Sequence, residues 1–353
     1  GEARLEAWTK VLERAITTVA YLSLYALGIT SVVGYASAFL FGALSGFLLA
    51  LWWVKRTVRV YEGQQGTQGD LGEAWLDNRS LMMQALPFAI TLGVLPYVVR
   101  IEKFIIGIEL GVDSAALFHV AQLAWLAGLV VPQALRAALL PVLGKARFSP
   151  SDFGKEMNTS LDICLGLLPI GIFAGAFIAK VFLPFAFPSQ YTDGSLGASA
   201  VDLFMILLLG WCFTLVATPT YTALQAGLRP WKFTFFIGLV VAFATATGFL
   251  LIGWQAPLGD GQGLYAAAFA STLSAAFAFL LSIHLADSWA FFFNRSKEWL
   301  FALVFMSLAC IGLYSNTWFA ATGVLLFLFM PQALRAIGST VGEKTLAKSS
   351  QEE

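Results

Sequence analysis

The feature that most constrains this chain is a series of long, uninterrupted apolar stretches. We count about ten of them, each about 18 to 30 residues long and bounded by charged residues, Gly or Pro. About 20 apolar residues in a helix cross the hydrocarbon core of a bilayer. The stretches cover residues 15–33, 35–54, 81–110, 115–140, 160–187, 201–225, 233–254, 264–285, 299–314 and 318–334. The sequence therefore predicts an all-α, polytopic membrane protein with about ten transmembrane helices.

Composition excludes two broad classes of protein. Apolar side chains make up 58% of the 353 residues and charged ones 12%, whereas soluble domains are about half apolar and a quarter charged. A soluble enzyme is therefore excluded. The 21 basic and 21 acidic side chains balance, so the chain lacks the basic excess of nucleic-acid-binding proteins, and no nucleic-acid partner is expected.

The distribution of Lys and Arg predicts the orientation in the membrane. When the stretches are numbered in order, all but three of the 21 basic residues fall on one side of the membrane, in alternating loops or at the adjoining helix ends; the exceptions are Arg100, Lys103 and Lys180. Cytoplasmic loops carry such an excess of Lys and Arg. We therefore expect both termini of the chain in the cytoplasm.

Two patterns suggest how the chain is divided. The longest polar interruption, residues 55–80, is rich in Gly and Gln and is interpreted as a cytoplasmic linker between two helical bundles. Residues 35–51 and 265–281 form a weak internal repeat, as in transporters built from duplicated halves. A six-helix repeat would then place four further helices before residue 1. The predicted parts are the last two helices of a first lobe (1–54), the linker (55–80), a six-helix second lobe (81–288), and an extra helical hairpin with a cytoplasmic tail (289–353).

Residues 85–146 carry the most specific pattern in the chain, ALPFAITLGVLPYVVRIEKFIIGIELGVDSAALFHVAQLAWLAGLVVPQALRAALLPVLGKA. It has an early Pro (Pro87), a basic–acidic–basic cluster of Arg100, Glu102 and Lys103, a short turn, and a next helix that ends in a Pro-containing phrase. This pattern resembles the seventh and eighth helices of the O-antigen-type polysaccharide flippases. These belong to the multidrug/oligosaccharidyl-lipid/polysaccharide exporter superfamily. The phrase ALQAGLRP at 223–230 is similar to the inner end of their tenth helix, although Glu102 stands where the family commonly has Asp.

The resemblance implies a fold and a function. It implies a MATE-like bundle of two six-helix lobes, in which these ten helices are the fifth to fourteenth and the first four are missing. It also implies a transporter in the bacterial inner membrane that flips a polyprenyl-diphosphate-linked oligosaccharide by alternating access for surface polysaccharide synthesis. The implied partners are the lipid-linked oligosaccharide, membrane lipids and a polysaccharide polymerase or ligase. No enzymatic chemistry, cofactor or metal is expected.

The cluster near residue 100 has two interpretations. Arg100 and Lys103 are spaced i, i+3 and share a helix face with Tyr97, while Glu102 points elsewhere. A cationic stripe inside a cavity could bind a diphosphate through charge-assisted hydrogen bonds. Alternatively, both basic side chains extend to the outer membrane interface, as long cationic side chains near helix ends do.

A second polar stripe lies on the next predicted helix. His119, Gln122, Gln133 and Arg136 fall on one face, because 11 residues make almost three helical turns. The stripe could form a hydrophilic cavity wall or hydrogen-bond to other helices, and the same alternatives apply to Thr214, Thr218, Tyr221 and Gln225. The predicted substrate-binding residues are Arg100, Lys103, Glu102, Tyr97, Gln122, His119 and Gln133.

Three other functions remain open at this point. A cation-coupled multidrug exporter of the same superfamily would prefer buried carboxylates, of which Glu102 is the clear mid-sequence candidate. An intramembrane transferase would need an acid or His held at an interface beside a large outer loop, and the predicted outer loops are short. A scaffold of a glycan assembly complex would need no transport residues.

Overall fold

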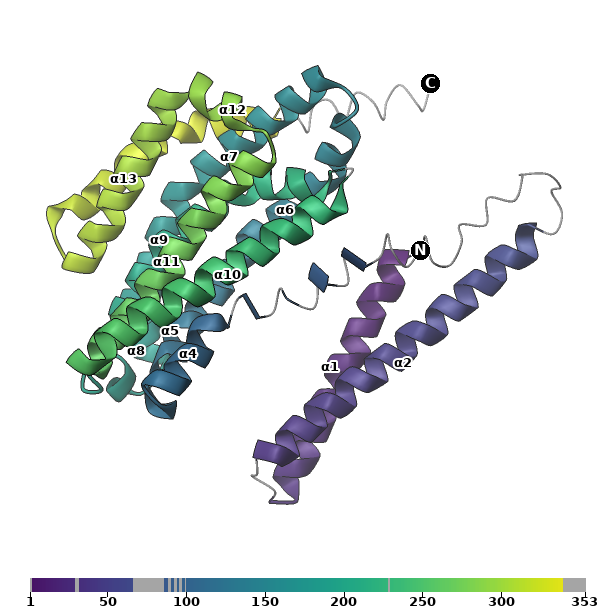
Figure 1. Cartoon of the computed structure of the whole chain (residues 1–353), viewed down its shortest axis with the longest axis horizontal. Helices are drawn as coiled ribbons and strands as arrows, with labels where there is room; N and C mark the ends of the chain where they lie inside the picture. The colour runs from purple at the N-terminus through teal and green to yellow at the C-terminus, as the bar shows by residue number, and fades with distance from the viewer. Residues whose placement is uncertain are drawn as a thin grey trace. The chain divides into compact units, whose positions relative to one another are not determined.

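The computed structural model describes residues 2–28, 32–65, 86–87, 90–91, 94, 97–98, 100–227 and 229–338. The described residues form helices and turns, without a strand among them. The chain divides into two compact units, Gly1–Leu76 and Asp77–Glu353 (Figure 1). Each unit is described by itself below.

The first unit is a hairpin of two helices, α1 (Glu2–Ala26) and α2 (Val32–Gln65). They pack through small side chains: a Cβ on Gly42 of α2 would overlap Thr17 of α1. The rings of Tyr21 and Tyr35 contact each other near the turn in a tilted arrangement, with ring centroids 5.5 Å apart. Because α2 continues to Gln65, residues 55–65 of the predicted linker are helical; residues 66–80 lie outside the described part of the chain.

The second unit is a bundle of long helices joined by short turns (Figure 1). Its elements are α4 (Ile101–Glu109), α5 (Val112–Gly128), α6 (Val130–Ala146), α7 (Pro150–Phe177), η1 (Ile178–Phe182), α8 (Leu183–Ala186), η2 (Ser189–Tyr191), α9 (Ala200–Gln225), α10 (Pro230–Gln255), η3 (Ala256–Leu258), α11 (Asp260–Leu285), α12 (Trp289–Asn294), α13 (Ser296–Ser315) and η4 (Trp318–Phe329). Here η1 is one π-helical turn, and η4 is a 3₁₀ helix that continues as an α-helix over residues 330–338.

Seven helical segments among the described residues are long and apolar enough to cross a membrane. They are Val112–Ala146, Pro150–Ala186, Ala200–Gln225, Pro230–Leu258, Asp260–Leu285, Ser296–Ser315 and Trp318–Gly338. These coincide with seven of the ten predicted stretches. The all-helical class is therefore confirmed, and the seven segments indicate a multi-pass membrane protein.

The count of ten is not reached within the described residues. The stretches at 15–33 and 35–54 fall on α1 and α2, where the apolar segment Ser37–Leu49 is shorter than the roughly 20 residues a crossing needs. Most of the first half of the stretch 81–110 lies outside the described residues, and α4 forms its second half. These three crossings remain predictions.

Local sequence explains where the long helices begin and end. Pro150 and Pro230 occupy the first positions of α7 and α10, where the missing N–H costs nothing. Gly111 separates α4 from α5 with a φ of 92°, and Asn316 ends α13 with a φ of 53°. Both are left-handed conformations that Gly adopts freely and Asn tolerates. The turns at 110–111, 256–259 and 316–317 form one end of the bundle, called here the Gly111 end, and the turns at 147–149, 226–227 and 286–288 form the Arg147 end.

Helix α9 is the central helix of the second unit. In its most apolar 18 residues, 72% are buried, against 22% to 50% in the other six candidate spans. It contacts α5, α6, α7, α10, α11 and α13. The span that precedes α7 is divided at Leu129 into α5 and α6, and this break faces both α9 and the cavity described next.

Candidate functional site

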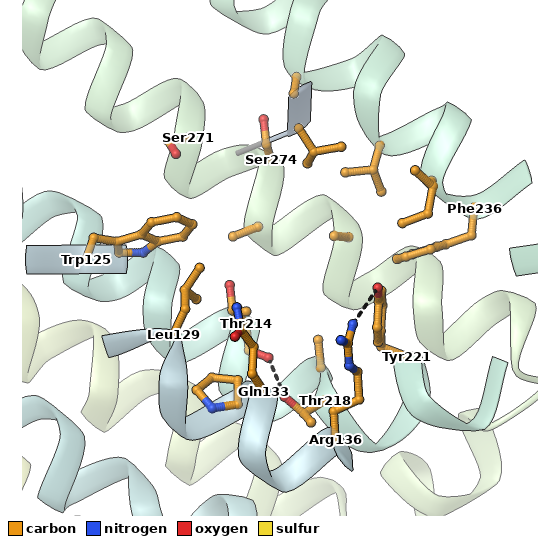
Figure 2. Close-up of a pocket in the computed structure, with 18 of the residues that line it drawn as sticks. Trp125, Leu129, Gln133, Arg136, Thr214, Thr218, Tyr221, Phe236, Ser271 and Ser274 are labelled. Atoms are coloured by element: carbon orange, nitrogen blue, oxygen red, sulfur yellow. Dashed lines mark hydrogen bonds between the residues drawn. The ribbon is translucent and has the colours of Figure 1, made fainter. Parts of the chain in front are cut away.

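A cavity of about 250 Å³ lies inside the second unit, between α4, α5, α6, α9, α10 and α11. Figure 2 shows Trp125 and Leu129 on one side and Tyr221 and Phe236 across from them, with Ser271 and Ser274 contributed by α11. The cavity is therefore built from helices that are far apart in the sequence.

Most of the lining is apolar, and a small polar set is distributed within it. The apolar lining is Val98, Trp125, Leu129, Pro132, Ala217, Phe236, Ile237, Val240, Ala244, Ala275 and Ala278. The polar lining is Glu102, Gln133, Arg136, Thr214, Thr218, Tyr221, Ser271 and Ser274. A mostly apolar wall with a few placed polar groups is typical of small-molecule sites.

Arg136 of α6 carries the positive charge of the cavity. Its guanidinium donates a hydrogen bond to the Tyr221 hydroxyl at 3.3 Å and lies 5.7 Å from the centre of that ring (Figure 2). Tyr221 is held in turn by Phe233 and Phe236, whose ring centroids are 5.0 and 5.7 Å away in edge-to-face geometry. No carboxylate pairs with Arg136 among the residues that the structure describes. The half-buried guanidinium therefore keeps most of its donors for a ligand.

Glu102, in the first turn of α4, carries the negative charge. Only 3% of the residue is exposed, and its side chain lies near Ser271 of α11. A charged group inside a membrane bundle is costly unless it is paired or serves a function. Within the described residues, no three His, Cys, Asp or Glu side chains lie close enough to hold a metal ion.

The other polar groups divide into acceptors and donors. The hydroxyls of Thr214, Thr218 and Ser274 each donate to a carbonyl of their own helix, so they offer a ligand only acceptor lone pairs. The indole N–H of Trp125 is buried and has no hydrogen-bond partner among the described residues. The cavity therefore offers two kinds of donor, the guanidinium of Arg136 and the amide of Gln133, beside several acceptors.

The predicted site residues do not all come together. Glu102 and Gln133 line the cavity, and Gln122 is buried but does not line it. Tyr97 is exposed and stacks on Phe104, with ring centroids 5.9 Å apart.

The basic residues and the predicted histidine form a separate group toward the Gly111 end. The Lys103 ammonium donates to Nδ1 of His119 at 2.7 Å, across α4 and α5, and Arg100 is exposed. The polar stripe predicted on this helix is divided: Gln133 and Arg136 line the cavity, whereas His119 and Gln122 do not.

Several lining residues were not identified from the sequence. Trp125, Leu129 and Pro132 lie within the predicted stripe, between Gln122 and Gln133 and at helical spacing from Arg136, but the stripe was defined by its polar members alone. Ser271 and Ser274 belong to a run of small residues on α11, and such runs usually pack closely against another helix. Only the arrangement of helices shows that these serines face a space.

Neither a protein-family model, nor a curated protein, nor a solved structure matches this chain. The resemblance stated above therefore rests on the residues quoted for it.

Proposed function

We propose that this protein is a flippase that moves a polyprenyl-diphosphate-linked oligosaccharide across the bacterial inner membrane for surface polysaccharide synthesis. The mechanism is alternating access within a MATE-like bundle of two lobes, in which this chain supplies about ten crossings and both of its termini are cytoplasmic. The sugar-diphosphate head group crosses through the interior while the lipid tail stays in the bilayer. No bond of the substrate is broken.

The observation that supports the proposal is the Arg136 guanidinium on the cavity wall. It is half-buried in a membrane-spanning bundle and has no carboxylate partner among the described residues. A planar guanidinium donates two parallel hydrogen bonds to a phosphate, and the bonds are charge-assisted. An anionic head group therefore satisfies this residue better than a neutral or cationic ligand.

The rest of the lining suits a sugar next to the phosphate. Aromatic faces at Trp125, Tyr221 and Phe236 can cover the apolar face of a sugar ring, and the amide of Gln133 can hydrogen-bond to its hydroxyls. The volume of about 250 Å³ is below the roughly 300–1,000 Å³ of a site for a drug-sized ligand. The site therefore holds one group of the substrate at a time.

A second cationic group would extend the route of the head group beyond the cavity. Arg100, Lys103 and His119 lie toward the Gly111 end, outside the cavity lining. In the predicted orientation this is the outer side, so the group would receive the diphosphate after it leaves Arg136.

A reconstituted flipping assay tests the proposal. The full chain is placed in liposomes, and the probe is a fluorescent polyprenyl diphosphate that carries one sugar. We expect Arg136→Ala to lower the initial flipping rate more than tenfold, because the charge-assisted phosphate contact is lost. Arg136→Lys should restore only part of the rate, because a single ammonium cannot make the bidentate contact.

The matched control is Arg335→Ala, which removes an exposed arginine that does not line the cavity. It should flip the probe at the parent rate. Parent-level flipping by Arg136→Ala, or no flipping above empty liposomes by the parent chain, would contradict the proposal.

The buried carboxyl of Glu102 favours a second candidate function, a cation-coupled exporter of amphipathic drugs. A carboxylate in the same cavity as the indole of Trp125 can bind an organic cation by charge and by cation–π attraction. The test is efflux of ethidium from cells that express the full chain, with and without Glu102→Gln. Efflux that depends on Glu102, together with no flipping of the lipid probe, would replace the first proposal with the second.

A further inference from the structure

The long span Val112–Ala146 is interrupted at its midpoint for a covalent reason. Pro132 has no backbone N–H, so the carbonyl of Gly128, four residues earlier, loses its helical partner. The proline ring also crowds that carbonyl. At the break, the N–H of Leu129 is shared between the carbonyls of Trp125 and Leu126. The helix therefore ends as α5 and restarts as α6 with an orphaned acceptor between them.

Trp211 of the central helix α9 supplies the missing donor. Its indole N–H donates to the carbonyl oxygen of Gly128 at 2.8 Å, and the residue is 5% exposed. The hydrogen bond satisfies an acceptor that the helix leaves without a partner, so it fixes the direction in which that carbonyl points.

Two glycines make room for the indole. A Cβ on Gly128 would lie 3.0 Å from the indole nitrogen, and a Cβ on Gly171 of α7 would overlap the far edge of the ring. The ring is therefore held between α5 and α7, and it cannot turn away from Gly128 without a collision on the other side.

The break controls the shape of the cavity, because lining residues lie on both sides of it. Trp125 precedes the break, and Gln133 and Arg136 follow it. The 17 residues of α6 extend roughly 25 Å, so a 10° change in the bend would move the far end by about 4 Å. At that end Arg147 hydrogen-bonds to the carbonyl of Ala226, which limits the movement to a few ångströms.

We propose that Trp211 is a positioning residue that substitutes for the missing N–H of Pro132, sets the angle between α5 and α6, and thereby fixes the place of Arg136 in the cavity. The inference concerns the geometry of the cavity and holds whichever ligand the cavity binds.

The test uses pulsed electron–electron double resonance on the full chain in nanodiscs to measure a distance that depends on this angle. Spin labels are attached at Lys145→Cys on α6 and Trp231→Cys on α10, which are both exposed and close to the Arg147 end. The three native cysteines are buried, and labelling of the parent chain checks that they do not react. A second pair, Asp113→Cys and Asp260→Cys, reports on the Gly111 end, away from α6.

We expect Trp211→Phe, which keeps a ring but removes the donor, to shift or broaden the first distance distribution by about 2 to 5 Å. The second pair should not change. Pro132→Ala restores the helical N–H to the Gly128 carbonyl. In that background, Trp211→Phe should therefore have little further effect on either pair.

The double variant separates positioning from packing. If Trp211 only fills space, the effects of Trp211→Phe and Pro132→Ala on the distances will add, and the inference fails. It fails also if Trp211→Phe leaves the first distribution unchanged. Should Trp211→Phe not fold, Gly171→Ala offers a second route, because it pushes the same ring and should produce the same shift only when Pro132 is present.

Discussion

The two sides of helix α9 differ in how they are packed. Toward α7, Trp211 fits into the space left by Gly171, and Gly175 meets the side chain of Leu208. Toward α6, α10 and α11, the same helix presents Thr214, Thr218 and Tyr221 to an open cavity. One continuous apolar helix thus has a filled side and a side that keeps space for a ligand.

The filled side continues into the hairpin of α13 and η4. A Cβ on Gly312 would overlap the backbone of Ala320, and one on Gly166 of α7 would overlap Ala333. Small residues allow backbones to approach closely, which is the main source of helix association where water is absent. Glycine placement on the neighbouring helices, more than hydrophobicity, therefore decides which side of α9 packs closely.

The largest effect on stability is expected at a glycine where two backbones approach closely. Gly312→Ala should lower the free energy of unfolding by about 3 kcal/mol, because the new Cβ meets the backbone nitrogen of Ala320, which cannot rotate away. Gly238→Ala on α10 is the control, with nothing within 4 Å of its Cβ, and it should raise stability by up to about 1 kcal/mol. Steric-trap unfolding in bicelles measures both. Equal changes in the unfolding free energy for Gly312→Ala and Gly238→Ala would contradict the distinction between closely packed and open helix surfaces.

The same chemical change on the two sides gives the sharpest comparison. Ala309 of α13 is buried and faces Gly323 of η4, whereas Ala275 of α11 lines the cavity. Ala309→Leu should therefore cost about 2 kcal/mol of unfolding free energy through overpacking. Ala275→Leu should change it by less than about 0.5 kcal/mol, because the larger side chain enters existing space.

In the flipping assay, we expect Ala275→Leu to have the larger effect and Ala309→Leu the smaller one. Ala275→Leu fills the cavity and should reduce flipping strongly, and Ala309→Leu should reduce it only as far as folded protein is lost. If Ala275→Leu is destabilised, the cavity has no room for the larger side chain. If it flips the probe normally, the cavity is not used for transport.

The smallest effect is expected where two hydroxyls join α9 to α11. The Oγ1 of Thr220 and the Oγ of Ser282 are 2.6 Å apart, and both side chains are fully buried. A double-mutant cycle with Thr220→Val and Ser282→Ala should give a coupling of about 0.6 kcal/mol, since each hydroxyl also has a carbonyl partner in its own helix. A coupling above about 2 kcal/mol would make this contact a larger determinant than the glycine approaches.

Parts of the candidate site could be predicted from helical spacing. Arg136 and Gln133 follow from the stripe on the predicted span 115–140, and Thr218 and Tyr221 follow from the stripe on α9. His119 and Gln122 belong to the same predicted stripe but do not line the cavity, because the neighbouring helices decide which part of a stripe meets a space. Pro132 was visible in the sequence, yet a proline alone does not say in which direction a helix bends.

The partners of the charged residues near position 100 were not predictable either. Arg100, Glu102 and Lys103 are adjacent in the sequence, and helical spacing predicts that Glu102 points away from the two basic residues. That Lys103 meets His119, and that Glu102 meets Ser271, depends on which helices lie beside α4. Each of these contacts joins residues on two different helices, so helical spacing within one helix cannot predict it.

The sequence by itself determined that this chain is helical and suited to a membrane, because uninterrupted apolar runs of about 20 residues satisfy their own backbone hydrogen bonds only as helices. It also determined where most of the seven described spans begin and end, through proline and glycine. The tertiary structure alone decided which polar residues share a cavity, because helices that are apolar on all sides carry no periodic signal to say which face meets which neighbour. That choice depends on close contacts such as Trp211 against Gly128, which form only when the helices are assembled.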